Sequence, residues 1–471
     1  MNKTTFSARC CFKKIRLTIA FHFLSLFSIL LFSGYSSAQT YPYTFNVFDE
    51  VLFYDGYAAT VSDPVPSGIL RLNNACYTRK LTAIELSNFG NKLTMNLTIK
   101  ASCDNYDRIG NVNLAFVPKN SVTYSYNDVE RIEIGRYITP FMDKNVQPDE
   151  VPYTFTIDNV AQIFKNQQLL TQYDIWVELE LFGVPYAANQ QIAGCSGRND
   201  VFFGTLDLVT DFDSNLTYGT NFLLPMEFKY LLRNYTINGT DVLGQTTKSI
   251  TFTLNEDVQN AQLHLITSNH GANSGGEEYV RRTHYINFDN TNVLTYMPGG
   301  VSCVPYRVYN TQLNCIYYNC STGQPLPNTN AAWSWNNWCP GDKIPTRIIN
   351  LGNLAQGTHT FNINVPTAVF NGGQGEFPMS VYLQGETQSL SSESFTKTTT
   401  INLSPNPVKD ILTINAKDAE VVAVTVFSVT GKEILESTSK SIDFSSLQSG
   451  LYLVKIELSN SEMITKKVIK N

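Results

Sequence analysis

The segment CDNYDR, residues 103–108, places two aspartates and an arginine directly before an alternating apolar run, IGNVNLAFV. Asp107 and Arg108 stand where the expected strand begins, so their charged groups are held near its end. A carboxylate so placed can accept or deliver a proton, and a guanidinium can orient an anion. The same pair can equally be a structural salt bridge, and this segment alone does not separate the two interpretations.

The elements that must position these side chains are strands. Almost every segment alternates apolar and polar residues with a period of two; KLTMNLTIK, for example, places Leu93, Met95, Leu97 and Ile99 on one face. Helical periodicity is almost absent apart from a short candidate turn in VAQIFKNQQLL. Turn residues recur about every 8–12 positions, as in antiparallel sandwiches. The sequence therefore predicts an all-β chain.

A chain of 471 residues is too long for one core. Breaks are expected in TDFDSNLTYGTN (210–221), which is polar and turn-rich, and in SLSSESFTKTTT (389–400), which has the composition of a solvated linker. The predicted units are a signal peptide (1–38), a first sandwich (39–210), a second sandwich (211–388), the linker (389–400) and a small C-terminal β-sandwich (401–471).

The first 38 residues have the pattern of an export signal. Lys13, Lys14 and Arg16 precede the apolar stretch LTIAFHFLSLFSILLF, and the small residues SSA follow it before Gln39. A permanent N-terminal anchor is the alternative, because the apolar stretch is a little long for a signal. No other stretch approaches membrane length, so we expect a secreted or cell-surface protein without a permanent membrane span.

Nine cysteines are present, and Cys10 and Cys11 leave with the leader. In an oxidising compartment the remaining seven should form disulfides with one left over. We expect pairs between Cys76 and Cys103, which lie on neighbouring predicted strands, between Cys303 and Cys315, and between Cys320 and Cys339. This leaves Cys195 free; the sequence does not fix these links. A zinc site at the last three cysteines is the alternative, but no fourth ligand follows at the required spacing.

Composition excludes several classes of function. The net charge of −6, with scattered signs, gives no basic patch for nucleic acid. His264, His270, His284 and His359 form no paired arrangement, and no phosphate-binding glycine loop or zinc-protease motif is present. We therefore expect no metal and no cofactor. Aromatic residues make up 12% of the chain, which suits a sandwich core and also suits stacking on sugar rings.

The C-terminal stretch carries four blocks in order: INLSPNPVKDILTI, VFSVTGKEIL, IDFSSLQSGLYLVKI and MITKKVIKN. Through residues 401–471 these blocks resemble the C-terminal sorting domain of type IX secretion substrates. The resemblance implies that this unit engages the type IX secretion machinery and directs the protein across the outer membrane. An ordinary C-terminal sandwich without a sorting role is the alternative.

Residues 40–388 resemble the peptide N-glycosidase F family. The matching pieces are VFDEVLFYDGY, CDNYDRIGNV, EIGRYITPF, EEYVRRTHYI and WCPGDKIPTRI, in this order. The resemblance implies two consecutive jelly-roll-type sandwiches. It also implies an amidase that cuts N-glycans from asparagine in N-glycosylated proteins or glycopeptides.

Amide hydrolysis needs a deprotonated water, stabilisation of the carbonyl oxygen and protonation of the leaving nitrogen. The resemblance places Asp107 on the principal catalytic aspartate of the family, Glu278 on a glutamate that contacts the sugar, and Glu178, in IWVELEL, on a supporting glutamate. An exposed aspartate has a pKa near 3.9, so burial or neighbouring carboxylates must raise it before Asp107 is an effective base. We expect the three carboxylates to meet in one cleft.

The candidate substrate-binding residues are Arg108, Tyr106, Glu180, Trp335 and His270. Three of them depart from the family pattern: Tyr106 and Glu180 replace tryptophans, and Trp335 replaces an arginine. Gly276 and Val280 stand where the family has paired cysteines.

These departures indicate a changed glycan preference or a lost reaction. The alternative functions are a non-catalytic carbohydrate-binding or adhesion protein on the same fold and, by fold analogy only, a copper monooxygenase. The four histidines offer no copper ligand set for the latter.

Overall fold

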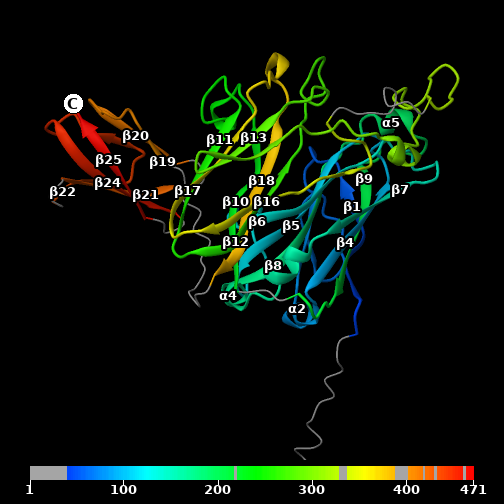
Figure 1. Ribbon diagram of the computed structural model, residues 1–471. Helices are drawn as coiled ribbons and strands as arrows, with labels where there is room; N and C mark the ends of the chain where they lie inside the picture. Colours follow the sequence, from blue (N-terminus) through cyan, green and yellow to red (C-terminus); the bar gives the residue numbers. More distant parts are fainter. Residues whose placement is uncertain are drawn as a thin grey trace, which may run out of the picture.

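The computed structural model describes residues 40–216, 220–327, 337–387, 401–416, 420–428, 432–459 and 463–471. The expected leader (1–38), the expected linker (389–400) and Trp335 all lie outside these ranges. Strands dominate the described residues and the helices are short, so the predicted all-β fold is confirmed (Figure 1).

The first sandwich packs a four-stranded sheet on a six-stranded sheet. In β4 every second side chain is buried, as the alternation of KLTMNLTIK predicts. The inner faces of the two sheets share one apolar core. The strands, in sheet order, are β1 (Tyr43–Tyr54), β9 (Asp200–Asp211), β4 (Lys92–Ala101) and β7 (Glu150–Thr156), then β15 (Lys343–Ile344), β6 (Glu130–Ile138), β5 (Ile109–Pro118), β8 (Tyr173–Leu181), β3 (Cys76–Lys80) and β2 (Ile69–Asn73).

Short helices close the ends of this sandwich. Thr82 caps α2 in a reciprocal pair with Glu85, so the turn VAQIFKNQQLL is not the only helical segment. That segment forms two helices, α3 and α4, and Asn166 caps the second. The bounds are α2 (Ala83–Asn88), η1 (Tyr126–Asp128), α3 (Asp158–Ile163), α4 (Gln167–Gln172) and α5 (Ala188–Gln191).

The second sandwich has two four-stranded sheets around a core of its own. Strand β15 comes from this half of the chain but pairs with β6 of the first sandwich, so the two units interlock. The strands are β10 (Thr220–Leu232), β18 (Phe377–Thr387), β12 (Val258–Thr267) and β16 (Arg347–Leu354), then β11 (Thr247–Leu254), β17 (Gly357–Asn364), β13 (His284–Phe288) and β14 (Thr291–Tyr296); the short helices are η2 (Ile237–Gly239), η3 (Val304–Tyr309) and η4 (Asn371–Gly373).

The C-terminal unit is a small sandwich with a third separate core. Its strands lie at the opposite side of Figure 1 from α5. They are β19 (Ile401–Ser404), β20 (Ile411–Ala416) and β23 (Ser441–Asp443) in one sheet, and β22 (Glu433–Ser437), β21 (Val421–Ser428), β24 (Gly450–Leu458) and β25 (Met463–Lys470) in the other.

The two larger sandwiches meet through buried polar groups. Arg136 on β6 binds Glu133 at 2.6 Å and donates to Ser268 Oγ at 2.9 Å and to the Pro378 carbonyl at 2.7 Å. Ser380 on β18 donates to Glu133. Because every charge in this group is paired, the outer face of the six-stranded sheet can be buried without leaving an isolated ion.

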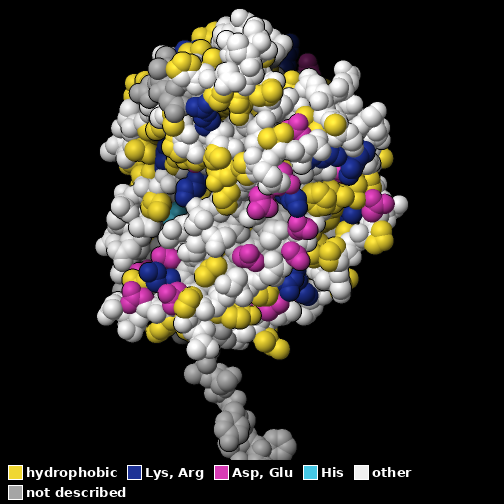
Figure 2. All heavy atoms as spheres, turned by 90° about the vertical axis from the view of Figure 1, so that its right-hand side faces the viewer, with side chains coloured by type: hydrophobic (Ala, Val, Ile, Leu, Met, Phe, Trp, Pro, Cys, Tyr) yellow, Lys and Arg dark blue, Asp and Glu magenta, His cyan; other side chains and the backbone are white. Residues whose placement is uncertain are grey.

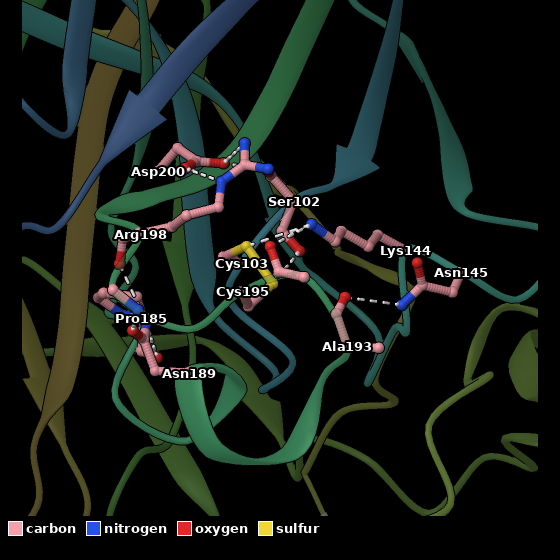
Figure 3. Close-up of a disulfide and its surroundings, with 12 residues drawn as sticks. Ser102, Cys103, Lys144, Asn145, Pro185, Asn189, Ala193, Cys195, Arg198 and Asp200 are labelled. Carbon is pink, nitrogen blue, oxygen red and sulfur yellow. Dashed lines mark hydrogen bonds and ion pairs between the residues drawn. A yellow bond between two sulfur atoms is a disulfide. The ribbon is translucent and has the colours of Figure 1, made fainter.

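The disulfides differ from the predicted pairing. The structure joins Cys103 to Cys195, Cys303 to Cys339, and Cys315 to Cys320. Figure 3 shows the first of these, with the Lys144 ammonium 3.5 Å from Cys103 Sγ.

Among the cysteines that the structure describes, Cys76 is the free one, and not Cys195. Cys76 lies opposite Glu180 on the face of the six-stranded sheet that the second sandwich covers. Cys103 instead follows β4 in the other sheet and meets the turn after α5. The expectation of neighbouring strands was wrong because β3 and β4 belong to different sheets.

Candidate active site

The loop before β5 is held by a salt bridge within CDNYDR. Arg108 donates to the buried Asp104 from Nε at 2.6 Å and from Nη2 at 3.2 Å. Asp104 also accepts the backbone N–H groups of Tyr106 and Val184. Arg108 therefore pairs with Asp104, and Asp107 takes part in no salt bridge among the described residues.

Thr139, just after β6, fixes the other side of this loop. Its hydroxyl accepts the Arg108 N–H at 2.7 Å and donates to the Tyr106 carbonyl at 3.1 Å. Its own N–H donates to the Arg108 carbonyl at 2.8 Å. The backbone is fixed on both sides of Asp107. Its half-buried side chain is therefore held in place without a salt bridge of its own among the described residues.

Two adjacent glutamates of the second sandwich have different surroundings. Glu277 is fully buried, binds Arg282 twice at 2.8 Å, and accepts the backbone N–H of Val369 and Phe370. Glu278 is also buried, and its Oε2 lies 3.5 Å from the Gly271 nitrogen. Glu277 therefore anchors the loop, and Glu278 is the glutamate whose charge acts on Asp107.

Asn337 clamps this glutamate loop, and sequence reasoning did not find it. Its amide nitrogen donates to the carbonyls of Glu277 at 2.8 Å, Glu278 at 2.7 Å and Val280 at 3.2 Å. Trp338, the next residue, donates from Nε1 to the Asn269 carbonyl at 3.0 Å. The only sequence signal for Asn337 was its position directly before the WCPG block.

Asp107 and Glu278 are electrostatically coupled. Loss of hydration on burial raises the pKa of Asp107 well above its usual range, and the negative charge of Glu278 raises it further, against the opposing effect of Arg108. Burial also raises the pKa of Tyr279, whose hydroxyl bonds Glu278, and of Tyr317, where the Asp107 charge adds to the effect. The charges of these groups therefore act on one another, although the groups come from two sandwiches.

The raised pKa of Asp107 predicts a pH-dependent stability change. The unfolded chain releases this proton near pH 4, whereas the folded chain retains it to higher pH, so stability falls as the pH rises through that interval. Asp107→Asn should therefore stabilise the protein by about 1–2 kcal/mol at about pH 8 and by little at about pH 3.5. Urea unfolding at both pH values measures the difference. Glu150→Gln, an exposed carboxylate on β7, is the matched control and should show no such gain; equal gains would contradict the assignment.

Glu178 does not lie with the other two carboxylates. It accepts from Arg131 Nε at 2.8 Å, Tyr124 at 2.7 Å and Asn113 at 3.1 Å. In the ladder of β5 and β8 it lies opposite Asn113, four residues or about 13 Å along the strand from Ile109, where β5 begins. The expected meeting of three carboxylates is therefore wrong for Glu178, because the strand register carries it away from the end of β5.

Glu180 belongs to the same group as Glu178. It binds Lys229 Nζ of the second sandwich at 2.5 Å and accepts from Asn113 at 2.6 Å and Tyr126 at 2.9 Å. Cys76, Glu178 and Glu180 place possible ligand atoms within 4.8 Å of one another. Arg131 and Lys229 already neutralise the two carboxylates, so this cluster does not suit a metal ion.

The remaining predicted residues have mixed placements. Tyr106 is 42% exposed and packs edge-on against Phe141 at 5.9 Å, beside the Arg108 guanidinium. His270 lies against Trp338 at 5.9 Å, and its Nε2 is 2.7 Å from Ser268 Oγ. Burial lowers the pKa of His270 to about 3, so the ring is neutral at physiological pH.

Buried amide groups near the site lack protein partners. Asn105 Oδ1, two residues before Asp107, has no hydrogen-bond partner among the described residues. The same holds for both side-chain amide atoms of Asn269, the residue next to His270. Unsatisfied buried polar groups are costly, so their concentration here fits a site that receives a polar ligand.

The face shown in Figure 2 carries charged side chains of both signs. Lysine and arginine side chains there are interspersed with aspartate and glutamate. Within the described ranges, the helices are all too short to cross a bilayer.

Comparisons with known proteins agree with this architecture. Residues 44–196 match the family described as "Peptide-N-glycosidase F, N terminal", and residues 238–384 match "Peptide-N-glycosidase F, C terminal". Residues 402–471 match "Secretion system C-terminal sorting domain". A search of curated proteins found no match.

The solved structure of PNGF-II shares the fold. PNGF-II superposes with a TM-score of 0.53 at 20% identity over 74% of this chain and 66% of PNGF-II, so this chain spans just under two thirds of that protein. PNGase F, a glycosylasparaginase from Flavobacterium meningosepticum, gives a TM-score of 0.43 at 18% identity over 74% of this chain and 97% of that one. With both halves matched in chain order, the chain belongs to the peptide N-glycosidase F family and carries a type IX secretion sorting domain.

Proposed function

We propose that this protein is an exported amidase that hydrolyses the bond between asparagine and the first N-acetylglucosamine of an N-glycan. Water adds to the side-chain carbonyl carbon and the carbon–nitrogen bond breaks, which gives aspartate and a glycosylamine. The observation that carries the proposal is the electrostatic coupling of Asp107 with Glu278, two carboxyl groups that come from different sandwiches.

A carboxyl group coupled to a second one can act as an acid or as a base at neutral pH. When two such groups lie close together, one holds a proton while the other is ionised. The protonated group can deliver its proton to the leaving nitrogen, and the ionised group can take one from the attacking water. Asp107 is the group proposed to act at the amide, and Glu278 the group proposed to orient the sugar and hold the pKa of Asp107 high.

The surroundings support a sugar-bearing substrate. Tyr106 offers an exposed ring, and Asn105 and Asn269 offer buried amide atoms that sugar hydroxyls can satisfy. The Arg108–Asp104 bridge keeps the loop in place, so the reacting groups need little rearrangement. The sorting domain supports a role outside the cell, where N-glycosylated proteins or glycopeptides are the proposed substrates.

Hydrolysis of an N-glycopeptide in heavy-oxygen water tests this function. An amidase places the heavy oxygen in the carboxyl group of the new aspartate, and mass spectrometry of the peptide detects it. A glycosidase that cuts between sugars would leave the asparagine amide intact, which would contradict the proposal. Glycopeptide binding without any conversion would instead support the alternative of a non-catalytic carbohydrate-binding protein.

A further inference from the structure

A separate pocket lies at the far end of the first sandwich. It encloses about 700 Å³ and is lined by residues 80–83, 86–87, 119–120, 164–165, 167, 170 and 174. This volume is typical of sites for small organic ligands, which span about 300–1,000 Å³. In Figure 1, α2 and α4 mark this end of the molecule, and α5 lies near the opposite end.

The chain path separates this pocket from the Asp107 site. Strand β4 begins shortly after α2 and ends just before Cys103, and its ten residues span about 33 Å. Strand β5 begins after Arg108 and returns to Lys119 beside the pocket. The two sites therefore lie at opposite ends of the same two strands, and a ligand in one does not touch the other.

The floor of the pocket is apolar. Leu81, Leu86 and Phe164 line it and are buried in the structure, and Leu170 is half-buried beside them. Two exposed apolar residues stand on the same segments: Ile84 is 76% exposed, and Val122 is 82% exposed. An alkyl chain on this floor would gain from the removal of apolar surface from water.

The charged lining of the pocket is basic. Lys80 and Lys119 lie 3.3 and 2.9 Å from the same carboxylate, Asp174. One negative charge therefore pairs with two positive charges. Lys165 forms no salt bridge with any described residue, and burial lowers the pKa of its ammonium group. With three lysines and one aspartate, the pocket lining has a net positive charge, whereas the whole chain has a net charge of −6.

We propose that this pocket binds an anionic amphiphile, a molecule with one acidic head group and an alkyl chain. The head group binds Lys165 and the excess positive charge of Lys80 and Lys119, and the alkyl chain lies on Leu81 and Phe164. A neutral sugar fits the pocket less well, because the charged groups of the lining are three ammonium groups and a single carboxylate, and the floor is apolar. This binding is independent of the proposed amidase activity.

Calorimetric titration with dodecanoate, below its micelle concentration, tests the proposal on the mature protein. We expect saturable binding of one dodecanoate, and at least about tenfold weaker binding of dodecanol, which has the same chain without the charge. Dodecyl phosphate should bind like dodecanoate if the pocket recognises the charge and chain rather than one particular acid.

Two pairs of variants locate the site. Lys165→Glu should weaken dodecanoate binding at least about tenfold, whereas Lys409→Glu, exposed in the C-terminal unit, should leave it unchanged. Ala83→Trp should fill the pocket and abolish binding, whereas Ile84→Trp, on the same helix but outside the lining, should not.

Three results would overturn the proposal: no saturable binding, equal affinity for dodecanol and dodecanoate, or full binding by Ala83→Trp. Glycan release by the same variants keeps the two ideas separate. Ala83→Trp should release glycans as the unaltered protein does, and an inactive parent protein would leave the dodecanoate result standing.

Discussion

Asp107→Asn should lower kcat/KM for glycan release by at least about a thousandfold. The amide of asparagine keeps the size of the side chain, so the loop held by Asp104 and Thr139 should stay in place. What disappears is the only carboxyl group of this loop that no salt bridge neutralises. Release from a labelled glycopeptide, followed over time, measures the loss.

The control for this variant is a carboxylate of similar size elsewhere on the surface. Glu150→Gln should leave kcat/KM unchanged. Asp107→Glu keeps the acid but moves it by one methylene, and it should recover only a small part of the rate. If Asp107→Asn cleaved glycopeptides at the normal rate, Asp107 would have no part in the chemistry.

The fold was accessible from the sequence because the burial of strands follows their alternation. KLTMNLTIK became β4, in which Leu93 and Ile99 face the core as predicted. A strand of a sandwich buries every second side chain, whichever strands it pairs with. Local pattern therefore sufficed for the class of fold.

The site was accessible only in part. No pattern in the sequence brings Asp107 to Glu278, because the two residues come from different sandwiches; the family resemblance supplied that pair. Resemblance misplaced Glu178, which the register of β8 against β5 puts beside Asn113. Asn337 was missed because its role is to bind backbone carbonyls. Nothing in the sequence distinguishes it from other short polar residues in loops.

The disulfide prediction failed for a related reason. Pairing by closeness in sequence or by adjacent strands joined Cys76 to Cys103, but consecutive strands of a sandwich often lie in different sheets. Cys103 instead meets Cys195, with 5.4 Å between their Cα atoms. Such contacts depend on how the sheets are stacked, which the alternation of single strands does not encode.

The second large effect concerns stability: Arg131→Met should destabilise the protein by about 3–5 kcal/mol. Arg131 is 5% exposed and is the cation that pairs with Glu178, which is fully buried. Among the described residues, its removal leaves Glu178 with only the neutral donors Asn113 and Tyr124. A buried carboxylate without a counter-ion is costly, and the methionine side chain fills the space without supplying charge. The midpoint of urea unfolding, followed by intrinsic fluorescence, measures the change.

The double variant Arg131→Met, Glu178→Gln separates this structural role from catalysis. It removes the isolated charge, so it should recover a large part of the lost stability. Because Glu178 lies opposite Asn113, about 13 Å along β5 from the strand end that follows Asp107, the folded double variant should also release glycans at a rate within about tenfold of the unaltered protein. A loss as large as that of Asp107→Asn, at full stability, would mean that Glu178 takes part in the reaction, as the family resemblance implied. The stability and the glycan-release rate of the double variant together decide whether Arg131 and Glu178 have a structural role alone.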